Sequence, residues 1–260
     1  MAELFDLDLR ARRRDRAAHI GVEPFLFERV FEDCLERIAM TNRRFGSALL
    51  FGCPIPSWRD RLGTVADRVS VADPGALFAD HAGGEHVVED RWQPESARYD
   101  LCLTIGTLDT ANALPKVLGA IRGAMLPGGL CLGAFPGADT LPQLRAAMLA
   151  ADMATGVARP HVHPRIEAAA VAPLLELAGF ANPVVDVDRI AIAYPSLARL
   201  IDDLRRMAAT NLLTSRSGPM NRTAFEAASA AFASAGDGTR TIETIEIVHF
   251  AAWTPRPNRQ

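Results

Sequence analysis

The sequence has almost no lysine and no long uncharged apolar run. Lys116 is the single lysine among 28 basic residues, and we interpret this bias as a sign of a GC-rich bacterial genome rather than of a function. No stretch of 18 uncharged apolar residues occurs, and no apolar segment of signal-peptide type follows the N-terminus, which argues against a transmembrane helix. These absences predict a cytoplasmic protein without stable membrane insertion.

Cysteine is also scarce, and its spacing excludes two common roles. Cys34, Cys53, Cys102 and Cys131 form no C-x-x-C pair and show no metal-ligand spacing. We therefore expect reduced thiols and no zinc site. Cys53 lies nearest to the candidate site described below, but no evident base accompanies it. We expect it to be an unreactive thiol rather than a nucleophile.

An excess of positive charge is missing as well, since the net charge is −3 and the pI is near 6.1. This excludes a dedicated nucleic-acid-binding protein, because phosphate backbones require a concentrated positive surface. The local exception is a basic run near the N-terminus. A solvated first helix is the interpretation we prefer for it, and contact with an acidic partner, lipid headgroups or RNA is the alternative. The run comprises Arg10, Arg12, Arg13, Arg14 and Arg16.

What the sequence does contain is an alternation of apolar strands and amphipathic helices. The chain has 260 residues, of which 49% are hydrophobic, and this is enough for a substantial core. Apolar positions spaced by three and four predict a helix over 24–44. Strands are expected at 48–52, 69–72, 85–88, 99–105 and 129–135. Alternation of this kind predicts an α/β fold with a parallel, doubly wound sheet.

Beyond residue 135 helices dominate, and the last strands come as a pair. Helices are expected at 141–154, 166–178, 197–207 and 223–233, and strands at 184–193 and 241–253. The alternating pattern of the final strand indicates an exposed edge or a hairpin partner. We expect residues 254–260, which contain two prolines, to form a loose tail.

The loop after the first strand is the most informative segment. It reads Leu50-Phe51-Gly52-Cys53-Pro54-Ile55-Pro56, where a glycine-rich nucleotide loop would be expected. Glycine permits positive φ and offers an N–H to a ligand, whereas proline fixes φ near −65° and has no N–H. Pro54 and Pro56 therefore predict an altered binding loop.

Several motifs together resemble the class I S-adenosylmethionine (SAM) methyltransferases. The resemblance is closest to a group of complex I assembly factors that also resemble the malonyl carrier-protein methyltransferase of biotin synthesis, and it spans nearly the whole chain. Its most specific block is Gly137-Ala138-Asp139-Thr140-Leu141-Pro142-Gln143-Leu144-Arg145. Further matching segments are Leu4-Phe5-Asp6, Arg43-Arg44-Phe45, Tyr99-Asp100-Leu101, Asn112-Ala113-Leu114-Pro115, Leu126-Pro127-Gly128-Gly129, Pro160-His161-Val162-His163-Pro164 and Gly179-Phe180.

The resemblance implies a Rossmann-like sheet of seven strands whose last strand is antiparallel. It also implies an N-terminal helical extension over 1–45 and a methyltransferase-like domain over 46–253, with helical lid insertions at about 137–180 and 195–235. The cofactor would bind at the carboxyl ends of the first, second and fourth strands. In the family the loop reads approximately Asp-Leu-Gly-Cys-Gly-x-Gly, so Leu50, Pro54 and Pro56 are departures from it.

The cofactor-binding candidates implied by the resemblance lie in this loop and at the ends of the neighbouring strands. Asp73 matches a carboxylate that accepts bonds from ribose hydroxyls, and its alternative role is to form an Asp-Pro-Gly turn. Glu89 falls near the adenine-side loop, where its alternative is a solvated acid. Asp109 stands where the family commonly has histidine, and it either caps the next helix or binds a cationic group. The full set is Gly52, Cys53, Asp73, Glu89, Thr104 and Asp109.

His161 and His163 alternate along a proline-bounded loop. They would suit two iron or zinc ligands only if a carboxylate such as Asp152 or Glu167 joined them. We favour a polar loop without metal. No catalytic residue is identified, because methyl transfer requires mainly a well-positioned donor and acceptor and leaves no obligatory acid or base signature.

Three functions remain open from the sequence. The first is an assembly or protein-modification factor for respiratory complex I with impaired or absent SAM binding, for which the resemblance implies arginine hydroxylation as the chemistry. The second is an active SAM-dependent methyltransferase acting on a carrier-protein-linked or small acceptor. The third is a non-catalytic scaffold that binds a protein partner. Fold alone cannot choose among them.

Overall fold

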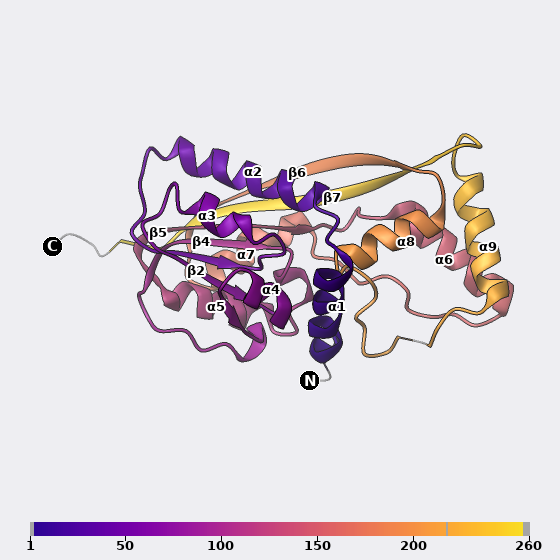
Figure 1. Cartoon of the computed structure of the whole chain (residues 1–260), viewed down its shortest axis with the longest axis horizontal. Helices are drawn as coiled ribbons and strands as arrows, with labels where there is room; N and C mark the ends of the chain where they lie inside the picture. Colours follow the sequence, from indigo (N-terminus) through magenta and orange to yellow (C-terminus); the bar gives the residue numbers. More distant parts are fainter. Residues whose placement is uncertain (1–2, 217, 257–260) are drawn as a thin grey trace.

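The computed structural model describes residues 3–216 and 218–256, which form one seven-stranded sheet with helices on both faces (Figure 1). The strands are β1 (Ala48–Phe51), β2 (Val69–Asp73), β3 (Glu85–His86), β4 (Tyr99–Ile105), β5 (Met125–Pro136), β6 (Ala181–Tyr194) and β7 (Thr241–Trp253). The α-helices are α1 (Leu7–Ile20), α2 (Phe25–Met40), α3 (Ser57–Leu62), α4 (Ala76–His81), α5 (Leu114–Ala124), α6 (Pro142–Thr155), α7 (Ala168–Leu177), α8 (Leu197–Arg206) and α9 (Arg222–Ser234). Two 3₁₀ turns, η1 (Glu89–Arg91) and η2 (Leu108–Thr110), follow β3 and β4.

The strand order is β3-β2-β1-β4-β5-β7-β6. Strands β1 to β5 pair in parallel, whereas β7 is antiparallel to both of its neighbours. This confirms the expected seven-stranded α/β sheet with an antiparallel last strand. The order reverses between β1 and β4, which places a topological switch at the carboxyl ends of these strands.

The prediction of an exposed edge for the final strand is wrong in one respect. Strand β7 lies inside the sheet between β5 and β6, and the edge strand is β6. The two strands pair in antiparallel orientation, from Ala181 with Trp253 at one end to Tyr194 with Thr241 at the other. The alternating polarity of the β7 sequence comes from the part of the strand near Thr241, where only one face of β7 is buried.

Each face of the sheet has its own apolar core. On one face α2 and α3 contribute Phe31, Ile38 and Trp58, and Phe31 stacks on Trp58 with ring centroids 4.5 Å apart. On the other face α5 and α7 contribute Ile121 and Leu175. Helix α2 therefore belongs to the main core, although the division into an extension over 1–45 and a domain over 46–253 remains a prediction.

The long β6 and β7 strands carry α6, α8 and α9 at their far end (Figure 1). Helix α6 follows Leu141, and its first free N–H groups are capped by the buried carboxylate of Glu243 from β7, which accepts from Gln143 N at 3.2 Å and Leu144 N at 2.8 Å. Asp139, which lies just before this helix, pairs with Arg189 instead of capping it. The helical end of the molecule is thus fixed to the sheet by a carboxylate distant in sequence.

The expected loose tail starts later than residue 254. Thr254 is buried, and its hydroxyl accepts a hydrogen bond from Gly129 N at 2.8 Å. Residues 257–260 of the expected tail lie outside the described part of the chain. Between residues 3 and 256, with 217 set aside, no helix has the length and apolarity required to span a bilayer.

Candidate functional site

Helix α1 lies across the switch point and turns two arginines into it. Arg10 and Arg14, four residues apart on one helical face, are each only 3% exposed. Ala17 continues this face and packs with Phe78 of α4 and Ala208. The expectation of a solvated first helix is therefore wrong for this face, whereas Arg12 and Arg16 are exposed as expected.

Arg14 forms a bidentate ion pair with Asp73 at the end of β2. Its Nε and Nη2 donate to the two carboxylate oxygens at 2.8 and 2.6 Å. The same oxygens accept from Cys53 N and Gly75 N, each at 2.7 Å. Asp73 thus forms the turn that the sequence allowed as an alternative and also holds an arginine. Each of its oxygens already accepts two hydrogen bonds, so neither is free for a ribose hydroxyl.

Arg10 forms the equivalent contact with Glu89 at the start of η1. Arg10 Nη1 donates to Glu89 Oε2 at 3.1 Å, a second contact joins Nη2 to Oε1, and Nη2 also donates to Thr107 O at 3.0 Å. Glu89 is 2% exposed, so the alternative of a solvated acid is wrong. Burial raises the pKa of Glu89, and the Arg10 charge opposes that rise. The charge of Arg10 therefore limits the rise in the pKa of Glu89 without cancelling it.

The glycine of the altered loop occupies a very tight position. Gly52 has a φ of 90°, and a Cβ built there would lie 2.5 Å from Ile105 O and 2.6 Å from Thr107 Cγ2. The loop after β1 is therefore packed directly against the loop after β4. Gly52 N donates to Ala72 O at 2.8 Å, and the following prolines have no N–H to offer.

Gly75 explains how α1 approaches so closely. A Cβ built on Gly75 would lie 2.6 Å from Cβ of Arg14, so the turn after β2 accommodates α1 only without a side chain there. Cys53 is buried in the same region, where burial and the neighbouring Asp73 raise the pKa of its thiol to about 12. A thiol with this pKa is protonated at neutral pH and is not a nucleophile.

Asp109 neither caps a helix nor faces solvent. Its carboxylate accepts from Arg165 Nη1 at 2.8 Å, and both side chains are buried. Of the two roles that the sequence left open for Asp109, binding a cationic group is the one that the structure displays. Helix α5 has no side-chain cap among the described residues, and Asp90 accepts from Asn112 N and Ala113 N just before it. Thr104 lies inside the sheet, where its hydroxyl has no partner among the described residues.

These contacts decide whether the crevice, as folded, fits an adenosyl group. Asp73 and Glu89 are occupied by arginines, and the loop lacks two of the backbone donors that a nucleotide loop offers. The two loops that would flank the ligand touch each other at Gly52. With α1 in place, Asp73 therefore has no acceptor left for a ribose hydroxyl. Of the six candidates, Gly52, Cys53 and Asp73 are brought together, and Glu89 contacts Arg10 beside them. Thr104 is the strand partner of Phe51, next to Gly52, and Asp109 lines a cavity together with Arg10 and Arg14.

The two histidines of the 160–164 loop diverge. His161 Nε2 lies 2.8 Å from Asp152 Oδ1, whereas His163 is buried and its Nε2 accepts from Leu212 N at 2.6 Å. Burial, together with the charges of Arg165, Arg13 and Arg145, lowers the pKa of His163 to about 3. In the residues that the structure describes, no three His, Cys, Asp or Glu side chains gather as metal ligands.

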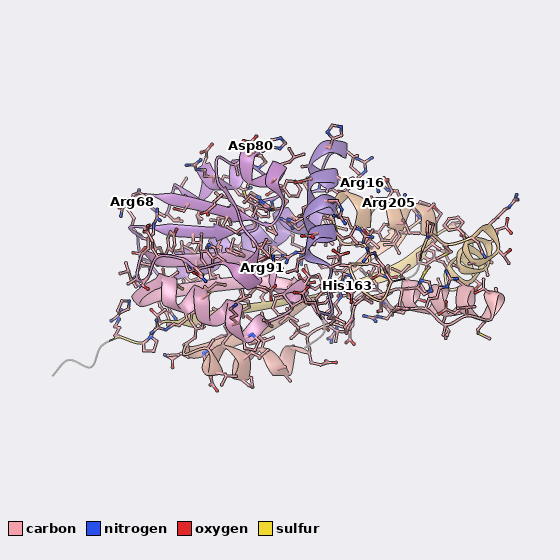
Figure 2. The ribbon with its side chains drawn as sticks, turned by 90° about the horizontal axis from the view of Figure 1, so that it is seen from below. Arg16, Arg68, Asp80, Arg91, His163 and Arg205 are labelled. Atoms are coloured by element: carbon pink, nitrogen blue, oxygen red, sulfur yellow. The ribbon has the colours of Figure 1, made fainter. Side chains whose placement is uncertain are left out.

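Two adjoining cavities lie next to the arginines of α1, and Arg10 and Arg14 line the inner one. The inner cavity, of about 110 Å³, is lined mostly by apolar side chains at the carboxyl ends of β4 and β5, among them Phe27, Ile105 and Ala134. The outer cavity, of about 500 Å³, lies between α6, α8 and the loops around residues 160 and 215. Both are lined by Leu141, His163, Arg165, Leu204 and Ala209. Figure 2 shows His163 at the junction between the sheet and the helical end.

Sequence reasoning missed Arg10, Arg14 and Arg165 as residues of this region. For the first two a signal was present, because Arg10, Arg14 and Ala17 follow the i, i+4, i+7 spacing of a buried helical face. Charged residues at such positions are normally taken as solvated. Arg165 carried no comparable signal, since its partner Asp109 is 56 residues away.

The curated relatives of this chain are an arginine hydroxylase and a methyltransferase. The chain is 29% identical over 274 residues to "Arginine-hydroxylase NDUFAF5, mitochondrial" of Rattus norvegicus, covering 96% of this chain and 77% of that protein. It is 35% identical over 161 residues to the malonyl-[acyl-carrier protein] O-methyltransferase of Xylella fastidiosa (strain M23), covering 61% of this chain and 53% of the enzyme. The chain thus spans about half the length of the second relative.

Solved structures with the same fold are methyltransferases or related proteins. YcgJ of Bacillus subtilis superposes with a TM-score of 0.57 at 9% identity, covering 85% of this chain and 97% of that one. The N-methyltransferase NodS of Bradyrhizobium japonicum WM9, in complex with S-adenosylhomocysteine, gives 0.52 at 13% identity, covering 95% and 99%. No protein-family model matches the chain. In its sequence relatives and its fold, the chain thus resembles the class I SAM-dependent methyltransferases, in particular the group that includes NDUFAF5 and the malonyl carrier-protein methyltransferases.

Proposed function

We propose that this protein is an assembly or protein-modification factor for respiratory complex I in which SAM binding is impaired or absent. The single observation that carries the proposal is the bidentate bond between Arg14 and Asp73, because it occupies the carboxylate that the family uses for the ribose. To admit the cofactor, this buried pair must be broken and α1 must move. Breaking a buried pair leaves an uncompensated charge, which is costly.

The altered loop supports the same proposal. Pro54 and Pro56 remove two backbone donors, and each lost hydrogen bond costs roughly 0.5–1.5 kcal/mol, so affinity for SAM falls by about tenfold to a hundredfold. The partner assignment comes from the relatives, since NDUFAF5 is named an arginine hydroxylase and the methyltransferase is named for an acyl-carrier protein. The second name points to a protein-borne acceptor, and we extend this to the present chain. The assignment to complex I rests on the resemblance of the sequence motifs. A cytoplasmic location remains part of the proposal.

Calorimetric titration with SAM tests the cofactor half of the proposal. We expect no saturable heat from the unaltered protein at millimolar SAM. The triple variant Arg14→Gln, Pro54→Gly, Pro56→Gly should bind at least about tenfold more tightly, because it frees Asp73 and restores the loop. Arg12→Gln, on the exposed side of α1, is the matched control. Micromolar binding of SAM by the unaltered protein would refute the proposal. The double proline variant, with Arg14 retained, remains informative if the triple variant does not fold.

Deletion of the gene in the source organism tests the assembly half. We expect reduced NADH:quinone reductase activity of complex I and its recovery when this chain is restored. Intact and fully active complex I after deletion would contradict the role. Recovery by the chain carrying Arg14→Gln, Pro54→Gly and Pro56→Gly would show that closure of the crevice is not needed for assembly.

The inner cavity favours a second candidate, methyl transfer to a carrier-protein-linked or small acceptor. It lies at the carboxyl ends of β4 and β5, beside the crevice, where an acceptor would approach a bound donor. This candidate requires SAM to bind, so the calorimetric titration separates it from the first. The third candidate, a scaffold without catalysis, predicts recovery of complex I by a chain that binds no SAM.

A further inference from the structure

More arginines than carboxylates line the outer cavity, and although Arg165 pairs with Asp109 and Arg216 with Asp6, the other two arginines have no carboxylate partner among the described residues. Four arginines and one aspartate line it: Arg13, Arg159, Arg165, Arg216 and Asp152. Asp152 is already bonded to His161 at 2.8 Å and to Arg159 N at 3.1 Å. In the described part of the chain, the side chains of Arg13 and Arg159 form no ion pair, and Arg13 donates only to the carbonyl of Asn211. The cavity therefore attracts an anion.

Arg165 stands at the boundary between the two cavities and has donors to spare. One of its nitrogens donates to Asp109, while Nε is buried and has no partner among the described residues. Burial lowers the pKa of Arg165, and Arg145 adds to this effect against the opposing charge of Asp109. A buried guanidinium with an unmet N–H is stabilised when a further oxygen ligand reaches it.

The inner cavity supplies the other half of a binding site. Its volume of about 110 Å³ is somewhat smaller than the roughly 150 Å³ of an engineered apolar cavity that binds benzene, and a chain of about four carbons fits such a space. Most of its walls are apolar, among them Phe27, Ile105, Ala134 and Ile245, and the charged side chains of Arg10, Arg14 and Asp109 also line it. A hydrocarbon group is thus accepted next to a cation.

We propose that the two cavities together bind an amphipathic anion, whose carboxylate or phosphate contacts Arg165 in the outer cavity and whose short hydrocarbon group enters the inner one. The site does not include Asp73 or Glu89, but its inner part is lined by their partners Arg14 and Arg10. Carboxylate and phosphate share the chemistry that an arginine recognises, and the probes below distinguish them.

Calorimetry with matched small probes tests this site on the full chain. Pentanoate and butyl phosphate each carry four carbons beyond the anionic group, and acetate and inorganic phosphate lack them. 1-Pentanol lacks the charge, and pentylamine reverses it. We expect pentanoate, butyl phosphate or both to bind at least about tenfold more tightly than acetate, inorganic phosphate, 1-pentanol and pentylamine. Which of the two binds identifies the anionic group.

Two variants localise the site. In Arg165→Gln combined with Asp109→Asn, two amides replace the buried ion pair without leaving a charge unpaired, and binding should fall at least about tenfold. Ala209→Leu narrows the passage between the cavities and should abolish the advantage of the longer probes over acetate and phosphate. Arg68→Gln, an exposed change at the opposite edge of the sheet (Figure 2), should have no effect.

The proposal is overturned if neither pentanoate nor butyl phosphate binds the unaltered chain, or if pentylamine binds equally well. Unchanged binding in the Arg165→Gln, Asp109→Asn variant also overturns it. Should that variant fail to fold, Ala209→Leu decides, because retention of the chain-length advantage there places the hydrocarbon elsewhere. Failure of these tests leaves the SAM titrations unaffected.

Discussion

At the carboxyl ends of the strands, arginines of α1 occupy the region around β1 and β2, whereas the region around β4 and β5 contains cavities. Around β1 and β2, Arg10 and Arg14 reach into the edge and pair with Glu89 and Asp73. Around β4 and β5, the pair between Arg165 and Asp109 leaves cavities on both of its sides. All three pairs are buried arginine–carboxylate contacts, yet only the first two fill the space that a ligand would use. Closure thus depends on where α1 lies rather than on the kind of contact.

The largest effect on stability is expected when the ion pair between Arg14 and Asp73 is broken. Asp73→Ala leaves Arg14 buried without a carboxylate and removes the acceptor of Cys53 N and Gly75 N. We expect the free energy of unfolding to fall by about 3–5 kcal/mol, measured by urea denaturation. Asp67→Ala, which breaks an exposed pair with Arg44, should cost less than about 1 kcal/mol. Equal effects of the two changes would mean that the Arg14 pair is not buried in solution.

A smaller effect is expected from His163, which lines both cavities and makes the stability of the chain depend on pH. His163 titrates at about 3 in the folded chain against 6.5 when unfolded, and it faces Arg13, Arg145 and Arg165. At a pH between these two pKa values, His163 is protonated in the unfolded chain but not in the folded chain. The free energy of unfolding therefore falls as the pH falls below 6.5. By pH 5 this loss amounts to roughly 2 kcal/mol.

His163→Gln keeps a side-chain acceptor for Leu212 N but cannot titrate. Urea denaturation at pH 7 and pH 5 should therefore show a smaller pH-dependent loss in this variant than in the unaltered chain. Burial also lowers the pKa of His249, but that residue is present in both proteins and cancels in the comparison. An unchanged difference between the two pH values would show that His163 is accessible to protons.

The smallest effect is expected at the N-terminus of α1, where a change tests whether this helix opens locally. Asp6 caps this helix by accepting from Leu9 N at 2.8 Å, and it pairs with Arg216 at 3.0 Å. Asp6→Ala should destabilise the chain by about 1 kcal/mol and increase amide hydrogen exchange along α1 more than along α5. Asp8→Ala, an exposed change in the first turn, should have a smaller effect. Uniform exchange changes across the chain would argue against local opening of α1.

The sequence predicted the fold well, because its strands are apolar runs bounded by Gly and Pro. The strand over Tyr99–Ile105 was placed with the observed bounds, and the helix before β1 was found from its spacing. The position of a strand within the sheet is harder to predict. The alternating pattern of β7 depends only on its own residues, whereas its place between β5 and β6 depends on residues distant in the sequence.

The sequence could predict which candidate residues lie close together but not their contacts, and their role in cofactor binding stays a prediction. Gly52, Cys53 and Asp73 do meet, as the ends of adjacent parallel strands must. Local pattern could not show that Asp73 and Glu89 would be taken by Arg14 and Arg10, whose partners lie 59 and 79 residues further along the chain. An arginine on a helix looks the same in sequence whether it faces water or a distant carboxylate.

That separation along the chain has a consequence for folding. Helix α1 is synthesised first, but the acids that hold it are presented only when β1, β2 and the segment after β3 have assembled. Long loops must close before either pair can form, and such contacts come late in folding. The nascent chain therefore passes through a stage in which the sheet is built while its first helix is still undocked. In that interval the switch point is open to any molecule that competes with the helix.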